Sequence, residues 1–340
     1  MPLTITEQPV DGYERVVSFS DDDFQAYIAV HNTALGPALG GCRIKSYASK
    51  DDALTDVLRL AKGMTYKSSL AGLNLGGGKC VVMAEKATRE IMLKVGEAVN
   101  YLNGLYITAE DVGTTLPDIQ VVGEVSPHIV HLDGSSNTAL GVLSCMMAAV
   151  KYHGEYGDTL NGVPIWIQGL GKVGMDLAMR LGTLDDLQLY VSDLRPDVVK
   201  HACDTLGARE ITEADKRFIA IYAPCAMGQI VNDTNLNTTR YSIICGSANN
   251  QLVHDEYAKV LQDNGVLYCP DYLVNAGGVI TADGEIEKWT DEKVIEHCSN
   301  LGDQLLKCFE MADEGVMGQK ITPLAAANML AEARFKSFES

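Results

Sequence analysis

Three lysines stand among glycine, alanine and leucine residues between positions 60 and 79. Lys62, Lys67 and Lys79 have no acidic neighbour within this stretch, which ends in Gly76-Gly77-Gly78-Lys79. Lysines usually lie solvated at the surface. A lysine held among small apolar residues loses hydration, which disfavours its charged form and allows it to act as a base. The pattern raises the question of whether Lys67 and Lys79 share a substrate, and the three glycines permit a backbone turn or a close approach that residues with side chains would block.

A carboxylate that could work with these lysines comes later in the chain. Asp111 follows the predicted strand 105–108 and stands two residues before Gly113. At the end of a strand a loop carboxylate can point into a cleft and exchange protons. The alternative is an Asx turn, in which the side chain only stabilises the loop.

The glycines before Lys79 do not form a P-loop. That motif needs a glycine six positions before its lysine and a serine or threonine directly after it. Leu73 and Cys80 occupy those two positions. A phosphate-binding role for residues 76–79 is therefore excluded.

A second candidate site lies near position 170. The run 160–168 predicts a turn and a buried strand, residues 175–184 predict a helix, and 187–192 a further strand. Between the first strand and the helix stand Gly169, Leu170, Gly171, Lys172, Val173 and Gly174, in the pattern G-x-G-x-x-G. In this setting the glycines bind a dinucleotide pyrophosphate at the helix N-terminus. Asp193, after the second strand, would bind the ribose 2′-hydroxyl and so favours NAD, whereas Arg195 nearby suits a 2′-phosphate.

Further strands are predicted at 218–222, 242–245 and 266–269, and each ends in a turn of small residues. Ligands of open α/β sheets bind at the carboxyl ends of the strands. Turn-making is the alternative for each asparagine there. The candidates for contact with the cofactor are Ala223, Pro224, Cys225, Ala248, Asn249 and Asn275, and Asn250 is a candidate for contact with the substrate.

The elements that position these residues follow from periodicity. Residues 13–19 and 25–31 predict an antiparallel pair of strands, and residues 35–43 a loop entering a strand. Ser49 with Asp52 predicts the start of a helix over 50–63, after which Lys67 follows and Lys79 opens a strand over 80–83. A second helix is predicted from 89 to 102, and the chain is helical from about 291, with Pro323 between two helices. The fold class is α/β with two domains.

Composition narrows the class of protein. The chain has 340 residues, enough for two domains with real cores, and a formal net charge of −18, which disfavours nucleic acid and anionic membranes as partners. Nine cysteines without a Cys-x-x-Cys pair, and no leader or membrane span, predict a reduced, cytoplasmic protein. His128 and His131 have metal-like spacing but lack a third ligand, so no metal is expected.

Several longer motifs resemble one family. They include Ala61-Lys-Gly-Met-Thr-Tyr-Lys67, Gly72-Leu-Asn-Leu-Gly-Gly-Gly-Lys79, Thr108-Ala-Glu-Asp-Val-Gly-Thr-Thr115 and Gly246-Ser-Ala-Asn-Asn-Gln-Leu252. With the other turns they cover nearly the whole chain. The sequence is similar to the glutamate, leucine, phenylalanine and valine group of amino-acid dehydrogenases, and most similar to the leucine/valine/phenylalanine branch.

The resemblance implies a division of the chain and of the chemistry. A substrate domain with a mixed sheet would comprise residues 1–135, joined by the helix 323–340, and a Rossmann-type NAD domain 136–322, with the active site in the cleft between them. Lys67 would bind the substrate carboxylate, Lys79 would be the base that activates water, and Asp111 would assist proton transfer. The glycines before Lys79 would make room for the substrate beside it. The reaction implied is reversible oxidation of an L-amino acid to a 2-oxo acid and ammonia. A homo-oligomer is implied, and a catalytically silent NAD-binding homologue is the alternative.

The resemblance also identifies substrate contacts. Gly41 and Asn250 match substrate-binding positions, and the side-chain pocket would comprise Leu39, Ala109, Val279 and Ala282. Glutamate-specific members carry a lysine where Leu39 stands. A distal carboxylate would be unpaired there, at a cost of several kcal/mol, so we expect an apolar substrate. The preferred class is leucine, valine or isoleucine, with phenylalanine or tryptophan as the alternative.

Overall fold

The computed structural model describes residues 2–226, 228–234 and 241–338. Contacts divide the chain into two units. Unit 1 comprises residues 1–133, 282–288 and 331–340, and unit 2 comprises residues 134–281 and 289–330. This division starts unit 2 two residues before the predicted boundary. It also assigns 282–288 to unit 1 and divides the C-terminal helix after Leu330, where the prediction placed residues 323–340 together. Residues 339–340 lie outside the described part.

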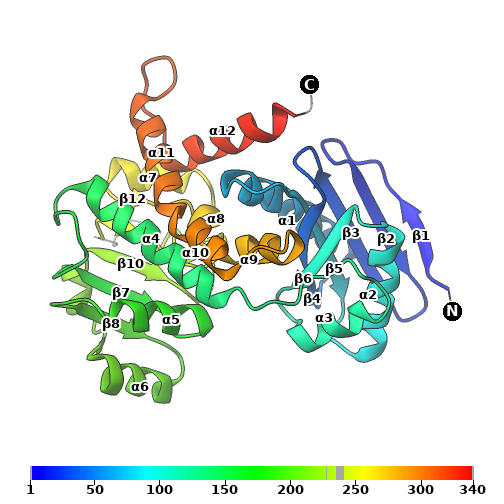
Figure 1. Cartoon of the computed structure of the whole chain (residues 1–340), viewed down its shortest axis with the longest axis horizontal. Coiled ribbons are helices and arrows are strands. Elements are labelled where there is room, and N and C mark those ends of the chain that lie inside the picture. The colour runs from blue at the N-terminus through cyan, green and yellow to red at the C-terminus, as the bar shows by residue number, and fades with distance from the viewer. Residues whose placement is uncertain (1, 227, 235–240, 339–340) are drawn as a thin grey trace. The chain divides into compact units, whose positions relative to one another are not determined.

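Unit 1 is built on a mixed sheet (Figure 1, blue to cyan). Among the described residues, the strand order is β1-β2-β3-β5-β4-β6, with β4 parallel to β5 and β6 and the other pairs antiparallel. Its strands and helices are β1 (Thr4–Glu7), β2 (Arg15–Ser20), β3 (Gln25–Asn32), β4 (Ala38–Lys45), α1 (Lys50–Leu70), β5 (Gly76–Met83), α2 (Arg89–Tyr101), β6 (Tyr106–Glu110) and α3 (Leu116–Gly123).

Each face of this sheet has its own hydrophobic core. Val57 and Ala61 of α1 pack against Val81 on one face, while Val95 of α2 and Val82 belong to the core on the other face. The predicted cap of α1 is confirmed, because the Ser49 hydroxyl accepts a hydrogen bond from the backbone N–H of Asp52 at 3.1 Å. The predicted antiparallel pairing of β2 with β3 is confirmed as well.

Three predictions in unit 1 were wrong in their boundaries. Helix α1 continues to Leu70 rather than ending at 63, so Lys67 lies inside its last turn. Strand β5 begins at Gly76, so the glycines belong to the strand. Strand β4 begins at Ala38, within the predicted loop. In each case, contacts with neighbouring elements keep residues in a helix or a strand where the local sequence pattern predicts a loop.

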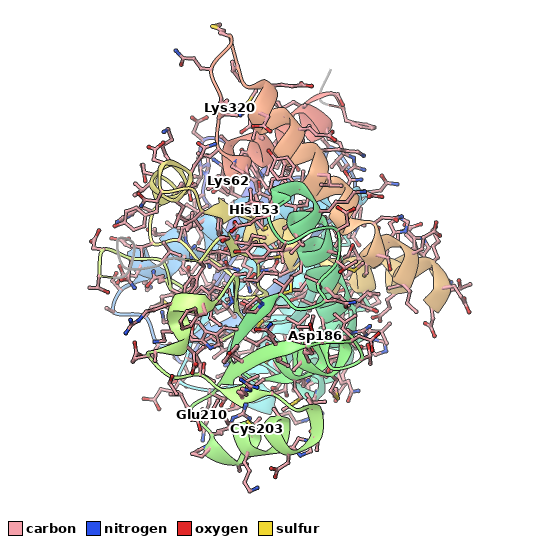
Figure 2. The ribbon with its side chains drawn as sticks, turned by 90° about the vertical axis from the view of Figure 1, so that its left-hand side faces the viewer. Lys62, His153, Asp186, Cys203, Glu210 and Lys320 are labelled. Atoms are coloured by element: carbon pink, nitrogen blue, oxygen red, sulfur yellow. The ribbon has the colours of Figure 1, made fainter. Side chains whose placement is uncertain are left out.

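Unit 2 contains a parallel sheet (Figure 1, green to yellow). Among the described residues the strand order is β12-β11-β10-β7-β8-β9, which is the Rossmann order 3-2-1-4-5-6 read from the other edge. Its strands are β7 (Pro164–Gln168), β8 (Gln188–Ser192), β9 (Arg209–Glu210), β10 (Ile221–Pro224), β11 (Ile243–Ile244) and β12 (Leu267–Tyr268). Figure 2 labels Glu210 on the edge strand β9 and Cys203 on the helix that precedes it.

The helices of the second half begin with the long α4. They are α4 (Ser135–His153), α5 (Lys172–Leu181), α6 (Pro196–Leu206), α7 (Tyr257–Asp263), α8 (Asp271–Val274), α9 (Gly277–Ile286), α10 (Asp291–Ser299), α11 (Leu301–Glu314) and α12 (Pro323–Lys336). Strand β10 begins at Ile221 because a short 3₁₀ helix, Asp215–Phe218, occupies the start of the predicted strand 218–222. The predicted α/β class with a doubly wound parallel sheet is confirmed.

Candidate active site

Strand alternation brings the candidate residues of unit 1 onto one face of the sheet. Successive side chains of a strand point to opposite faces. In β5, Cys80 and Val82 belong to the core beneath α2, whereas Val81 packs under α1, so Lys79 lies on the face that α1 covers. The same alternation assigns to this face Leu39, Gly41 and Arg43 of β4, Ala109 of β6 and, directly after β6, Asp111.

Lys79 and Asp111 form a buried ion pair. The ammonium Nζ lies 3.0 Å from Oδ2 of Asp111, with 6% of the lysine side chain and 19% of the aspartate side chain exposed. Nε of Arg43 donates to the same oxygen at 2.9 Å. Burial alone would raise the pKa of Asp111, but the positive charges and hydrogen bonds of Lys79 and Arg43 lower it to about 2. Asp111 is therefore a carboxylate at neutral pH.

The turn after β6 does not use the Asp111 carboxylate. The backbone N–H of Asp111 donates to Oγ1 of Thr114 at 2.9 Å, and the backbone N–H of Thr114 donates to the Asp111 carbonyl at 3.0 Å. The loop is thus closed by the main chain and by a threonine hydroxyl. The side chain of Asp111 faces Lys79, which is the arrangement that proton transfer requires rather than an Asx turn.

Helix α1 carries the other two lysines. Lys67 lies half-buried in its last turn, on the helix that covers the Lys79 face. Lys62, labelled in Figure 2, is exposed, and its ammonium lies 5.6 Å from the ring centre of Tyr66. Lys62 thus has an ordinary surface contact, and the geometry gives it no part in the site.

The glycines before Lys79 allow neighbouring parts of the protein to pack closely against β5. A Cβ added to Gly77 would lie 2.0 Å from the backbone nitrogen of Thr65 in α1, and one added to Gly78 would lie 2.7 Å from the Tyr106 ring. Real Cβ atoms do not approach this closely. The expectation that these glycines leave space for substrate is replaced by a packing role, because α1 and β6 fill that space.

The expected side-chain pocket comes from three elements. Leu39, in β4, is 2% exposed, and Ala109, in β6, is half-buried. Val279 and Ala282 lie in α9, which belongs to unit 2 up to position 281 and to unit 1 from position 282. None of these four side chains carries a charge.

The glycine-rich turn of unit 2 has the geometry of a dinucleotide site. Gly169 has φ +99°, which residues with side chains rarely adopt. A Cβ on Gly174 would lie 1.9 Å from the Gly169 carbonyl oxygen, whereas a Cβ on Gly171 would meet nothing within 4 Å. Helix α5 begins directly after Gly171, three residues earlier than predicted, and its first turn includes Lys172 and Val173. Open space therefore lies at the turn where a pyrophosphate would bind.

Asp193 connects the end of β8 to that turn. Its Oδ2 accepts from the backbone N–H of Leu170 at 2.7 Å, and Arg195 pairs with it, Nε to Oδ1, at 2.9 Å. The hydrogen bond from Arg195 is the largest cause of a lowered pKa for Asp193, so this carboxyl is ionised. Arg195 also donates to the Leu170 carbonyl at 3.0 Å. Both residues thus lie at the start of the glycine turn.

The other strand ends of unit 2 meet at the same edge of the sheet. Ala223 and Pro224 end β10, and Cys225 donates its backbone N–H to the Gln168 carbonyl at 2.8 Å. The backbone N–H of Ala248 donates to the Pro224 carbonyl at 2.8 Å. Because all these strands are parallel, their carboxyl ends converge as the sequence predicts.

Asparagines after β11 and β12 lie within this edge. Nδ2 of Asn275 donates to Oδ1 of Asn249 at 2.8 Å, and Asn250 adopts a left-handed conformation with φ +52°. Oδ1 of Asn275 is buried and accepts no hydrogen bond from the described residues. A buried polar atom of this kind needs a partner. The open space at Gly171 and the unsatisfied Asn275 oxygen both fit a dinucleotide.

Arg43 is the residue of this site that sequence reasoning missed. Besides binding Asp111, its Nη1 donates to Oδ2 of Asp56 at 3.1 Å, and that oxygen also accepts from the Tyr47 hydroxyl at 2.8 Å. A signal was present, because Arg43 follows Gly41 by two positions and so shares its face of the strand. The partner of Arg43 could not be found this way, since Asp111 is 68 residues away.

No metal centre is evident in the described part of the chain. Within residues 2–226, 228–234 and 241–338, no group of three His, Cys, Asp or Glu side chains is arranged to hold an ion. Nδ1 of His131 lies 2.7 Å from Oε1 of Glu285 instead. Over the same residues, none of the helices has the length and apolar character that a membrane crossing needs.

Comparisons with known proteins find similar chains over nearly the whole length of this one. Residues 14–126 match the Glu/Leu/Phe/Val dehydrogenase dimerisation domain, and residues 197–337 match the Glutamate/Leucine/Phenylalanine/Valine dehydrogenase domain. The chain is 38% identical to a leucine dehydrogenase of Thermoactinomyces intermedius over 95% of this chain and 91% of that one. It is 36% identical to a phenylalanine dehydrogenase of Caldalkalibacillus thermarum, over 98% and 94%. The crystal structure of L-tryptophan dehydrogenase from Nostoc punctiforme has 37% identity and a TM-score of 0.85, covering 96% of this chain and 97% of that one.

Proposed function

Because the chain belongs to the glutamate, leucine, phenylalanine and valine dehydrogenase family, we propose that it oxidises an apolar L-amino acid to the 2-oxo acid and ammonia, reversibly, with NAD. The buried ion pair of Lys79 with Asp111 carries this proposal. A lysine beside a carboxylate on the covered face of a sheet has little structural reason to be there, since burying charges is costly. It has a chemical reason if it moves protons.

The residues of unit 1 would divide the proton and charge work. Lys67 holds the substrate carboxylate through its ammonium group. Lys79 accepts a proton from the water that attacks the imine carbon, and later returns a proton to the departing ammonia. Asp111, whose Oδ2 lies 3.0 Å from Nζ, stays ionised and assists this proton transfer as the charged partner of Lys79.

The residues of unit 2 would hold the dinucleotide. When bound, the nicotinamide ring supplies the acceptor for the substrate hydride. The turn from Gly169 to Gly174 and the first N–H groups of α5 receive the pyrophosphate, and Asp193 receives the ribose hydroxyls. The pairing of Arg195 with Asp193 supports NAD, because an arginine neutralised by this carboxylate is less able to bind a 2′-phosphate.

The pocket residues support an apolar side chain on the substrate. The buried Leu39 would leave a distal carboxylate without a partner. Leucine, valine and isoleucine form the leading class. The small side chains of Ala109 and Ala282 favour the second candidate, an aromatic amino acid, because alanine takes up less volume than a larger aliphatic residue would.

A panel of L-amino acids assayed with NAD and with NADP tests the proposal. We expect NADH formation with apolar substrates, and ammonia-dependent NADH oxidation with the matching 2-oxo acid. Lys79→Ala should lower kcat about 10²–10⁴-fold. Purified protein that binds NAD but oxidises none of these amino acids would be a silent homologue and would contradict the proposal. Turnover of the reverse reaction without ammonia would indicate a hydroxy-acid dehydrogenase.

We also propose that the chain works as a homo-oligomer. The support is the matched region 14–126, whose family description is a dimerisation domain. Its expected partners are otherwise small molecules: the amino acid, the 2-oxo acid and ammonia.

A further inference from the structure

Asp111 is held by two cations on one oxygen. Lys79 Nζ at 3.0 Å and Arg43 Nε at 2.9 Å both contact Oδ2. Both cations thus anchor the same oxygen of the carboxylate.

Arg43 is itself fixed from a different element. Its Nη1 bonds Asp56 of α1 at 3.1 Å, and Tyr47 donates to the same Asp56 oxygen at 2.8 Å. Only 16% of the Arg43 side chain and 16% of the Asp56 side chain are exposed. The guanidinium therefore bridges two carboxylates in a planar, directional arrangement, which an ammonium group would not reproduce.

We propose that Arg43 is a positioning residue that keeps Asp111 ionised and oriented while Lys79 changes its protonation state. The inference rests on the proposed function, in which Lys79 gains one proton from water and later gives one up. When Lys79 is neutral, it no longer balances the charge of Asp111. Arg43 does, because a guanidinium stays protonated throughout. Without Arg43, the carboxylate would compete with the amine for the proton that Lys79 must receive.

Three further titratable groups that interact electrostatically with Asp111 do not take over this task. Cys42 of β4 has a raised pKa, chiefly through its hydrogen bond with Cys80, and burial raises the pKa of Tyr106 in β6. Burial likewise raises the pKa of Tyr47. All three are therefore neutral at working pH. They supply no positive charge to the site.

Asp56 balances the charge of Arg43. Burial would raise the pKa of Asp56, but hydrogen bonds from Tyr47 and Arg59 and the charge of Arg43 lower it overall. Arg59 contacts Asp56 at 2.9 Å from an exposed position and does not contact Asp111. It provides a matched control, since the same carboxylate loses an arginine when either residue is replaced.

The test needs neither substrate nor cofactor. The Asp111 carboxyl is titrated by ¹³C NMR in the full chain, in the wild type, Arg43→Gln, Arg43→Lys and Arg59→Gln. We expect Arg43→Gln to raise the pKa of Asp111 by at least one unit, Arg43→Lys to restore it in part and Arg59→Gln to leave it unchanged. An unchanged pKa in folded Arg43→Gln would overturn the inference. If Arg43→Gln does not fold, the pKa of Asp111 is measured in Arg43→Lys instead. A pKa of Asp111 and a kcat that both equal those of the wild type in that variant would overturn the inference.

Kinetics give a second, separate reading. In Arg43→Gln the acid limb of the pH profile of kcat should move to higher pH and kcat should fall about 10–10²-fold. NAD affinity, measured by fluorescence titration, should stay within about twofold, because Arg43 belongs to unit 1 and the glycine turn to unit 2. A fall in kcat with no movement of the acid limb would indicate a structural role only. A wild type that oxidises no amino acid would refute the proposed function, while the titration would still decide the role of Arg43.

Discussion

Replacing Gly77 by alanine tests how closely α1 must approach β5 for the site to form. The added Cβ would lie 2.0 Å from the Thr65 nitrogen, 2.3 Å from its Oγ1 and 2.6 Å from its Cα. Two of these three atoms belong to the backbone, so a side-chain rotation cannot relieve the clash. Helix and strand would have to separate by about 1 Å to reach even 3.0 Å, the shortest distance that real Cβ atoms show.

Both stability and activity should respond. Forced expansion of a packed core costs about 1–3 kcal/mol, which urea unfolding measures. Lys67 follows Thr65 by two residues in the same helix and would move with it. A misplacement of about 1 Å can cost about 10²-fold in rate. We therefore expect kcat/KM for the best amino acid to fall about 10²-fold, with unchanged NAD affinity in unit 2.

Gly63→Ala is the matched control. Gly63 lies in the same helix, is exposed, and a Cβ there would meet nothing within 4 Å. Alanine is favoured over glycine inside a helix by about 0.5–1 kcal/mol, so this variant should be slightly more stable and fully active. Gly77→Ala with the stability and kcat/KM of the wild type would refute the reasoning, because the close approach would then have no consequence.

Two further predictions concern α1 and Asp111. Arg334→Ala should destabilise the chain by about 1–3 kcal/mol, since its guanidinium donates to the carbonyls of Gly72 and Leu73 after the end of α1; urea unfolding measures this, and exposed Lys336→Ala should change stability by less than about 0.5 kcal/mol. The folded pKa of Asp111, about 2, lies below its ordinary value of 3.8, so its contribution is complete above that value and is lost as pH falls toward 2. The stability difference between the wild type and Asp111→Asn, followed by urea unfolding from pH 6 downward, should therefore be constant above about pH 5 and shrink by about 2 kcal/mol toward pH 2; a difference that does not depend on pH would contradict it.

The glycine turn of unit 2 and the elements beside it could be predicted from the local sequence pattern. The strand, glycine turn, helix and acid are close in sequence, and each residue type has a local reason, such as the positive φ of Gly169. Only the boundaries were displaced. Helix α5 begins at Lys172, directly after the turn. The sequence prediction started this helix at 175, where the apolar periodicity begins.

The candidate site of unit 1 could be predicted only in part. Lys79 and Asp111, which pair in the structure, were singled out by residue type, but the position where α1 ends was predicted wrongly. Its last turns contain Thr65, Ser68 and Ser69, polar residues that end the apolar periodicity and yet are buried. Ser69 donates to the Ala331 carbonyl at 2.7 Å, so a contact 262 residues away holds this part of the helix. Nothing in the sequence around Ser69 indicates that its partner is Ala331.

The strand order of unit 1 explains why a glycine must stand at position 41. Lys79 belongs to β5 and Asp111 follows β6, and these two strands flank β4. The ion pair therefore passes over β4. Cys42 pairs with Cys80 and Gly41 with Ala109, so Gly41 lies beneath the path from Lys79 to Asp111. A Cβ at Gly41 would lie 2.7 Å from the Asp111 Cβ. The missing side chain of Gly41 thus has a reason in the protein itself, because it lets Lys79 and Asp111 meet across the strand between them.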